Sequence, residues 1–158
     1  MKSKKLIWLF LIAMPLILIG MFAYSIFISK PEIKNSEWET SVNNGNVCEF
    51  LSGTNLVNDL SKNSVVAFST YNFDTGQKNI KTSCIMTKGK VSGGQITDYD
   101  IEIALHEKYV SDLGDDVCFT LQNSKKTKDI GFELHTSLVK LFLGYVKTLK
   151  YGSCAGFI

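Results

Sequence analysis

The longest apolar stretch of the chain lies near its start, where every residue from Leu6 to Ile28 is uncharged. As an α-helix with a rise of about 1.5 Å per residue, this stretch is roughly 34 Å long, which is enough to cross a hydrocarbon core of about 30 Å. Three lysines precede it, and such basic flanks stay in the cytoplasm. The pattern predicts a cytoplasmic segment 1–5, a transmembrane helix 6–28, a polar linker 29–36 and an exported domain 37–158.

The same stretch has a second interpretation as a cleaved leader. Ala23-Tyr24-Ser25 has the small-x-small spacing of a signal-peptidase site, so cleavage after Ser25 would release the rest of the chain. A cleaved leader usually has a shorter apolar core, of about 7–15 residues. Because apolar residues continue through Ile28, we favour the anchor and keep the leader as the alternative.

Patterns typical of strands dominate the first half of the exported part. The ranges 65–73 and 78–87 are rich in β-branched and aromatic residues and flank an Asp-Thr-Gly turn, which predicts a hairpin. The range 97–106 alternates with a period of two, which predicts a strand with one solvated face. Its acidic face would carry Asp98, Asp100 and Glu102. A helix over 98–113 is the competing interpretation.

The second half predicts more strands and one helix. We expect strands within 115–123 and 128–136, and a helix from Leu138 to Leu149, where apolar residues recur every three or four positions. The fold class is therefore α+β and strand-rich. We expect five to seven strands in a small antiparallel β-meander, curled or closed into a small barrel, with a C-terminal amphipathic helix.

Charge argues against a nucleic-acid partner. The chain has 17 basic and 15 acidic residues, and all the basic ones are lysines. Several of these lysines flank the predicted membrane helix, which leaves the exported part slightly acidic. Arginine, the side chain best suited to bidentate contacts with phosphates and base edges, does not occur in the sequence. We expect no direct contact with nucleic acid.

The four cysteines, Cys48, Cys84, Cys118 and Cys154, all fall in the part predicted to be exported. An even number of cysteines in an oxidising compartment predicts two disulfides, whereas zinc sites usually bring their ligands in close pairs. Three pairings are open to four cysteines. We favour Cys48 with Cys84 and Cys118 with Cys154, since shorter loops close at a lower entropic cost.

No residues form a recognisable catalytic set. His106 and His135 are the only histidines, and neither lies in a motif that supplies a nucleophile and a base. The spacing of Asp98, Asp100 and Glu102 lacks the glycine and the distal glutamate of a calcium loop. We therefore expect no enzyme, no catalytic residue, no metal and no cofactor. Since histidine changes charge near neutral pH, His106 and His135 are candidate pH-sensing residues.

The overall plan and one local string suggest a family. The basic start, the single membrane helix and the string "NSEWETSV" around Trp38 resemble the small inner-membrane partners of ToxR-like transcription regulators, of the ToxS, VtrC, PsaF and MyfF type. The resemblance implies a single-pass protein of the bacterial inner membrane with its C-terminal domain in the periplasm. Such a partner binds the periplasmic domain of the regulator, stabilises it, and helps sense acid, temperature or bile, thereby controlling virulence or fimbrial genes.

Resemblance to the VtrC type implies one further structural feature, a lipocalin-like partial barrel that the regulator completes. An apolar chamber between the two proteins would then take a small apolar ligand such as a bile salt. Two other roles fit the same sequence features. One is an accessory structural subunit of a pilus or secretion apparatus, and the other is a secreted disulfide-bonded effector, which requires cleavage after Ser25.

Overall fold

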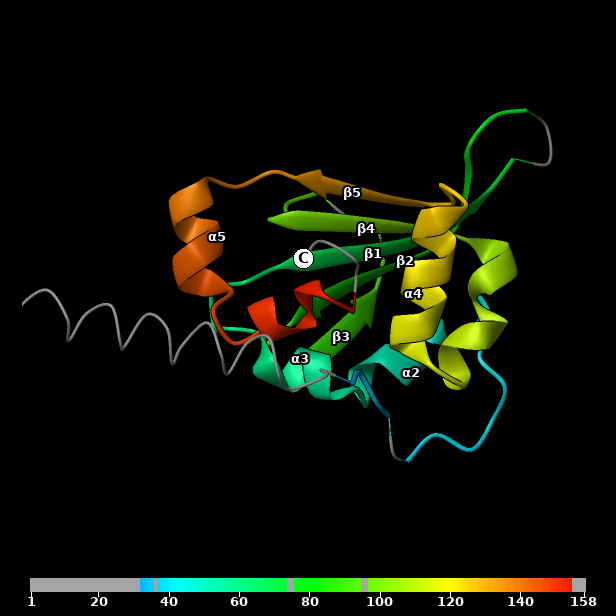
Figure 1. Cartoon of the computed structure of the whole chain (residues 1–158), viewed down its shortest axis with the longest axis horizontal. Coiled ribbons are helices and arrows are strands. Elements are labelled where there is room, and N and C mark those ends of the chain that lie inside the picture. Colours follow the sequence, from blue (N-terminus) through cyan, green and yellow to red (C-terminus); the bar gives the residue numbers. More distant parts are fainter. Residues whose placement is uncertain (1–31, 36, 74–75, 95–96, 155–158) are drawn as a thin grey trace, which may run out of the picture. The chain divides into compact units, whose positions relative to one another are not determined.

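The computed structural model describes residues 32–35, 37–73, 76–94 and 97–154 (Figure 1). The chain divides into two units after Lys30, and every described residue belongs to the second unit. The predicted membrane helix 6–28 and the candidate cleavage site after Ser25 lie outside the described residues. Within the described part of the chain, no helix is both long enough and apolar enough to cross a membrane.

The fold is α+β, as predicted, and is built on one five-stranded sheet with the strand order β3-β2-β1-β4-β5 (Figure 1). The predicted hairpin is confirmed as β1 and β2, and the predicted strands within 97–106 and 128–136 are confirmed as β4 and β5. In chain order the strands are β1 (Val66–Asn72), β2 (Asn79–Thr87), β3 (Lys90–Gly93), β4 (Ile101–His106) and β5 (Ile130–Leu134).

The expected antiparallel meander is wrong, because β1 and β4 are parallel neighbours. After β3 the chain returns across the sheet, so β4 pairs with the free side of β1 rather than with β3. All seven residues of β1 are buried, which suits the central strand of a sheet with a neighbour on each side. The described strands leave β3 and β5 as two open edges, so they form an open mixed sheet and not a closed barrel.

Short helices and 3-10 turns complete the domain. They are α2 (Val47–Ser52), α3 (Asn55–Asp59), η1 (Glu107–Tyr109), η2 (Ser111–Gly114), α4 (Val117–Lys126), α5 (Leu138–Gly144) and η3 (Leu149–Gly152). The competing helix over 98–113 is excluded, because that range contains β4 followed by the two 3-10 turns. The predicted C-terminal helix begins as expected but ends five residues early, at Gly144.

The strand expected within 115–123 is also wrong, because this range is helical from Val117 onward, as part of α4. The Asp116 side chain caps the helix by accepting a hydrogen bond from the Phe119 amide at 2.9 Å. Val117, Thr120 and Leu121 then share one buried face, at a spacing that only a helix provides. The β-branched and aromatic residues of this range favour a strand locally, but capping and burial override that preference.

The hydrophobic core lies on one face of the sheet. Phe68 of β1 and Leu105 of β4 are buried there against α2 and α4, whose contributions include Phe50 and Leu121. Figure 1 shows α4 crossing the strands, while α2 and α3 lie near β3. The opposite face carries polar side chains, including Glu102 and Glu133, because residues alternate between the two faces of a strand.

Asp100 corrects the expectation of a uniformly solvated acidic face. Its side chain is buried, and the residue is only 5% exposed. The carboxylate accepts hydrogen bonds from the Val65 amide at 3.1 Å and the Tyr145 hydroxyl at 2.9 Å, and it forms an ion pair with Lys140 at 2.5 Å. These contacts join α5 and the residue after it to the start of β1.

The charge state of this cluster follows from its contacts. Burial opposes ionisation of Asp100, but the hydrogen bonds from Lys140, the Val65 amide and Tyr145 outweigh it and lower the pKa of the carboxyl. Burial, followed by the hydrogen bond to Asp100, raises the pKa of the Tyr145 phenol. Asp100 is therefore the anionic acceptor in the contact that holds α5 against the sheet.

Candidate functional site

Three exposed large apolar side chains lie close together in sequence, at the end of β5 and the beginning of α5. Leu134 ends β5 and is 56% exposed, while Leu138 and Val139 begin α5 and are 66% and 68% exposed. We call these three side chains, together with the outer backbone of β5, the β5 edge surface. An open strand edge and exposed large apolar side chains are both features that occur at protein docking sites.

The backbone of β5 is oriented for strand pairing. The His106 amide donates to the Asp129 carbonyl at 2.9 Å, and the His135 amide donates to the Asp100 carbonyl at 2.8 Å. With these bonds at the two ends of the β4–β5 ladder, the antiparallel alternation turns the N–H and C=O groups of Ile130 and Leu134 away from β4. No other described strand pairs with this outer edge.

The other open edge, β3, is better protected against pairing. It has only four residues, begins with Lys90 and ends at Gly93, and its side chains are largely exposed. Short length and edge lysines are two of the usual devices that prevent strand addition. β5 carries neither lysine nor proline between Ile130 and Leu134. The edge most open to a partner strand is therefore that of β5.

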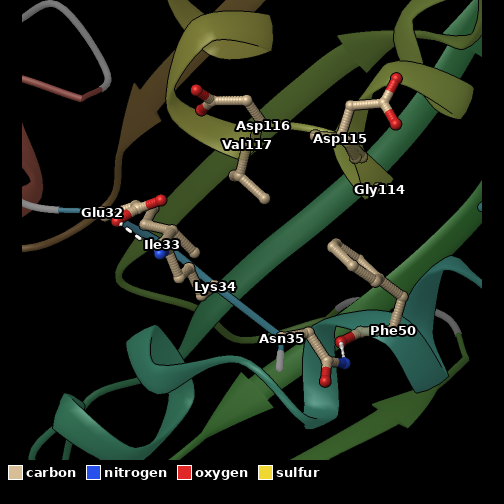
Figure 2. A pocket seen from close by; sticks show the side chains of 10 residues that line it. Glu32, Ile33, Lys34, Asn35, Phe50, Gly114, Asp115, Asp116 and Val117 are labelled. Carbon is tan, nitrogen blue, oxygen red and sulfur yellow. Dashed lines mark hydrogen bonds and ion pairs between the residues drawn. The ribbon is translucent and has the colours of Figure 1, made fainter. Parts of the chain in front are cut away.

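A small pocket lies at the opposite end of α4 from β5, beside the first described residues (Figure 2). It has a volume of about 290 Å³. It is lined by Glu32, Ile33, Lys34, Asn35, Phe50, Leu113, Gly114, Asp115, Asp116 and Val117. Phe50, Leu113 and Val117 are buried, whereas Asp115 and Asp116 are exposed and their carboxylates extend away from the pocket floor in Figure 2. Its volume is just below the range of about 300–1,000 Å³ that is usual for small-molecule sites.

His106 ends β4 and is half-buried among aromatic side chains. Its ring lies edge-on to Tyr71, with the ring centroids 5.4 Å apart, and its Nδ1 accepts a hydrogen bond from the Lys108 amide at 3.3 Å. The neighbouring Glu107 does not pair with it. Glu107 instead accepts a hydrogen bond from the Asn72 side chain at 2.8 Å.

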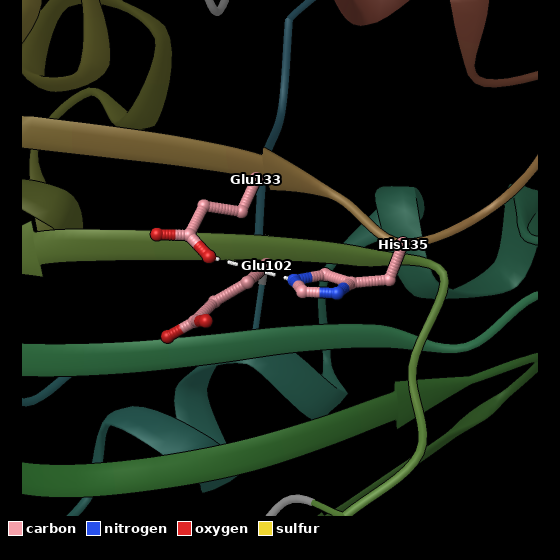
Figure 3. Close-up of side chains that lie close together, drawn as sticks. All are labelled: Glu102, Glu133 and His135. Atoms are coloured by element: carbon pink, nitrogen blue, oxygen red, sulfur yellow. Dashed lines mark ion pairs between the residues drawn. The ribbon is translucent and has the colours of Figure 1, made fainter.

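His135 lies just beyond the far end of the β4–β5 ladder, so the two candidate histidines are not brought together. Its Nε2 is 3.5 Å from a carboxylate oxygen of Glu133, and its ring packs edge-on against Tyr99 with the centroids 4.6 Å apart. Glu102 of the neighbouring strand lies beside both residues (Figure 3). The sequence placed Glu133 near His135, but only strand pairing brings Glu102 to them.

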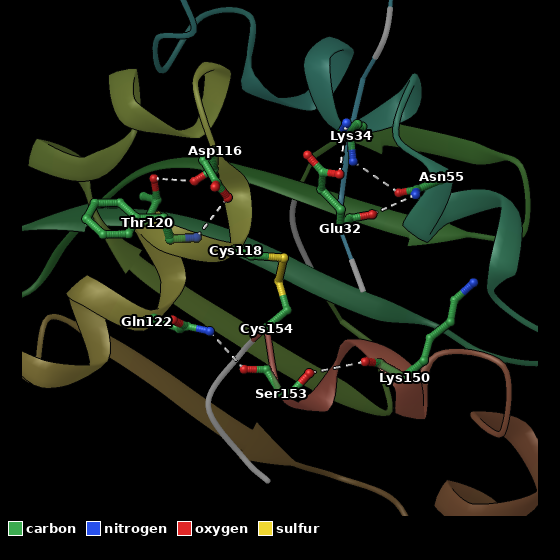
Figure 4. Close-up of a disulfide and its surroundings, with 11 residues drawn as sticks. Glu32, Lys34, Asn55, Asp116, Cys118, Thr120, Gln122, Lys150, Ser153 and Cys154 are labelled. Carbon is green, nitrogen blue, oxygen red and sulfur yellow. Dashed lines mark hydrogen bonds and ion pairs between the residues drawn. A yellow bond between two sulfur atoms is a disulfide. The ribbon is translucent and has the colours of Figure 1, made fainter. Parts of the chain in front are cut away.

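The four cysteines form two disulfides, as predicted, and the pairing is the favoured one. Cys48–Cys84 links α2 to β2. Cys118–Cys154 links α4 to the chain beyond η3, and beside it the Gln122 side chain donates to the Ser153 carbonyl at 3.1 Å (Figure 4). Each disulfide therefore joins a helix, α2 or α4, to a residue 36 positions further along the chain.

Trp38, the residue at the centre of the family-like string, has a packing role. Its ring lies edge-on to Phe50 with the centroids 5.6 Å apart, and it borders the core. Its indole nitrogen is buried and finds no acceptor among the described residues. Trp38 does not line the pocket.

Comparison with known proteins adds little to this picture. No family model and no curated protein matches the chain. Among solved structures, the chain is similar to the sterol carrier protein domain 2 of Helicoverpa armigera, with 17% identity, a TM-score of 0.38, and coverage of 66% of this chain and 76% of that one. It is also similar to the UbiJ-SCP2 ubiquinone synthesis protein, with 11% identity, a TM-score of 0.34, and coverage of 68% and 84%. These similarities are too weak to carry an argument about function.

Proposed function

We propose that this chain is a membrane-anchored periplasmic co-regulator without catalytic activity. Its exported domain binds the periplasmic domain of a ToxR-like membrane regulator, stabilises it, and helps convey acid, temperature or bile signals to virulence or fimbrial genes. The observation that carries the proposal is the β5 edge surface, which combines an open strand edge with three exposed apolar side chains. The two disulfides are consistent with an exported domain.

Binding at this surface would use two kinds of contact. A strand of the regulator would pair with the outward N–H and C=O groups of Ile130 and Leu134, as in other cases of strand addition. Leu138 and Val139, on the first turn of α5, would cover apolar side chains of the added strand. Completing the open sheet in this way also protects the partner strand from proteolysis, because a paired strand cannot enter a protease active site in extended form.

The identity of the partner is tested by purification from native membranes under mild detergent. The proposal expects recovery of a single-span protein with a cytoplasmic winged helix. Recovery of a multi-subunit envelope complex in its place would support the pilus or secretion-apparatus role. A mature chain that begins at Ile26 would show cleavage after Ser25 and support the effector role. Either of these outcomes would overturn the proposal.

The surface itself is tested by Leu138→Ser and Val139→Ser. Each change removes apolar area that the partner would bury, at a cost of about 1 kcal/mol or roughly fivefold in Kd. Phe119→Ser is the matched control, because Phe119 is 65% exposed on α4 and lies outside the β5 edge surface. Equal weakening by all three variants, or weakening by Phe119→Ser alone, would place binding elsewhere.

A small apolar ligand such as a bile salt is a separate part of the proposal. The pocket beside residues 32–35 offers an apolar floor, but its volume is small for a sterol-sized molecule. We therefore expect any bile salt to bind between this chain and its regulator. Measured bile-salt affinity should be at least tenfold higher for the complex than for this chain alone, and equal affinities would contradict the shared site.

A further inference from the structure

Strand pairing brings three metal-ligating side chains together on the sheet face opposite the core. Glu102 of β4 and Glu133 of β5 are directly opposed in the antiparallel register. His135 follows Glu133 by two residues, so it projects from the same face. One ligand atom from each residue lies within 4.8 Å of the other two, and Figure 3 shows the three side chains close together.

Two carboxylates opposed across a strand pair repel each other and destabilise the pairing unless a positive charge lies between them. The ion pair of His135 with Glu133, at 3.5 Å, provides that charge only when the imidazole is protonated. A divalent cation bound by all three residues would neutralise both carboxylates with the imidazole in its neutral form. A cation bound here would therefore relieve more charge repulsion than a cation bound among widely spaced surface carboxylates.

Contacts from outside the set orient two of the three ligands. The buried Ser69 hydroxyl donates to one oxygen of Glu102 at 3.1 Å, and the Tyr99 hydroxyl donates to the other at 3.0 Å. The Tyr99 ring also packs edge-on against the His135 imidazole at 4.6 Å. The carboxylates that ligate metals are commonly oriented by such outer hydrogen bonds.

We infer that Glu102, Glu133 and His135 bind a divalent transition-metal ion of the zinc type. One imidazole and two carboxylates suit zinc, with water completing the coordination, whereas calcium and magnesium favour oxygen ligands alone. Ligand atoms around zinc are about 3.3 Å apart, given metal–ligand distances of about 2.0–2.1 Å. The Glu133 and His135 side chains are exposed, so metal binding would need only a change of their rotamers to bring the donors to that spacing.

The bound ion would join β5 to β4 near Leu134, at the end of β5. Glu102 belongs to β4, while Glu133 and His135 belong to β5 and the residue following it. Metal binding would therefore slow local opening of the edge strand. This inference does not depend on the identity of the partner, and it stands or falls separately from the proposed co-regulator role.

The test uses the full-length, tag-free chain in mild detergent, stripped of metal with a chelator and titrated with ZnCl2 by calorimetry. We expect one equivalent of Zn2+ to bind and to raise the Tm, with no comparable effect of Ca2+ or Mg2+. His135→Gln and Glu133→Gln should each weaken Zn2+ binding at least tenfold. His106→Gln is the matched control, since it removes the only other histidine at the opposite end of β4, and it should leave the affinity unchanged.

Three results would overturn the inference. The first is no saturable Zn2+ binding, and the second is equal loss of binding in His106→Gln and His135→Gln. The third is Ca2+ binding as tight as Zn2+ binding, which would indicate a general acidic patch. Circular dichroism of each variant confirms folding, and Co2+ substitution adds a spectroscopic test, because its visible absorption should change when His135 is replaced.

Discussion

Replacing the buried Asp100 by asparagine should destabilise the domain strongly for so conservative a change. The carboxylate accepts from the Val65 amide, Tyr145 and Lys140, whereas an asparagine at this position would keep one acceptor oxygen and turn an NH2 group toward a second donor. A hydrogen bond to a buried charged group contributes about 1.5–3 kcal/mol. The Lys140 side chain is half-exposed, so its ion pair adds at most about 1 kcal/mol.

We therefore expect Asp100→Asn to lower the free energy of unfolding by about 2–3 kcal/mol at pH 7. For a domain of this size, that loss lowers the Tm by about 8–12 °C. The measurement is urea and thermal unfolding of the full-length chain in mild detergent, followed by circular dichroism. Asp98→Asn is the control, because Asp98 is exposed two residues away and should change stability by less than about 0.5 kcal/mol.

The pH dependence gives an independent check of the same reasoning. Because the folded state lowers the pKa of Asp100, its stabilising contribution is complete above the ordinary aspartate pKa of about 3.9 and is lost as the pH falls through the lower folded pKa. The difference between the wild type and Asp100→Asn should be constant from pH 7 to about pH 5 and should shrink below about pH 4. A loss below about 0.5 kcal/mol at pH 7, or a difference that does not change with pH, would refute the assignment of Asp100 as a buried ionised acceptor.

Three further predictions follow from the same structure. Without reductant, all four cysteines should resist alkylation under denaturing conditions, and free thiols in the untreated chain would contradict the two disulfides. Removing either disulfide should lower the free energy of unfolding by about 4 kcal/mol, because the two cysteines of each pair are 36 residues apart. Asp116→Ala should lower the unfolding free energy by about 1 kcal/mol through loss of the α4 cap, and an unchanged urea midpoint would show that the cap contributes nothing. Mass spectrometry of the mature chain should find residues 1–25 retained, and an N-terminus at Ile26 would contradict the anchor.

Local sequence patterns predicted several of the strands. The hairpin of β1 and β2 was predictable from its β-branched and aromatic residues and its turn, and β4 was predictable from the alternation of apolar and polar residues. α4 was not, since Val117, Phe119 and Thr120 favour a strand locally, and the Asp116 cap becomes recognisable only when the helix is known. The early end of α5 was equally hidden, because Tyr145 leaves the helix to reach Asp100, which is distant in sequence.

The candidate sites were likewise predictable only where their residues are close together in the sequence. His135 and Glu133 could be paired from the sequence, because they are two residues apart on one strand. Glu102 could not be added to them, since its position depends on the register between β4 and β5. The β5 edge surface was also out of reach, because a strand is an edge only with respect to the order of all its neighbours.

By itself the sequence determined the α+β class, the hairpin, two further strands and the presence of two disulfides, because these follow from alternation, turn residues and an even number of cysteines. It also favoured the disulfide pairing that the structure contains. Only the tertiary structure decided the parallel pairing of β1 with β4, the burial of Asp100 and the open edge of β5. Each of these features depends on contacts between residues that are far apart in the chain. The free energies of such contacts outweigh local conformational preferences, and the contacts produce no periodic pattern in the sequence.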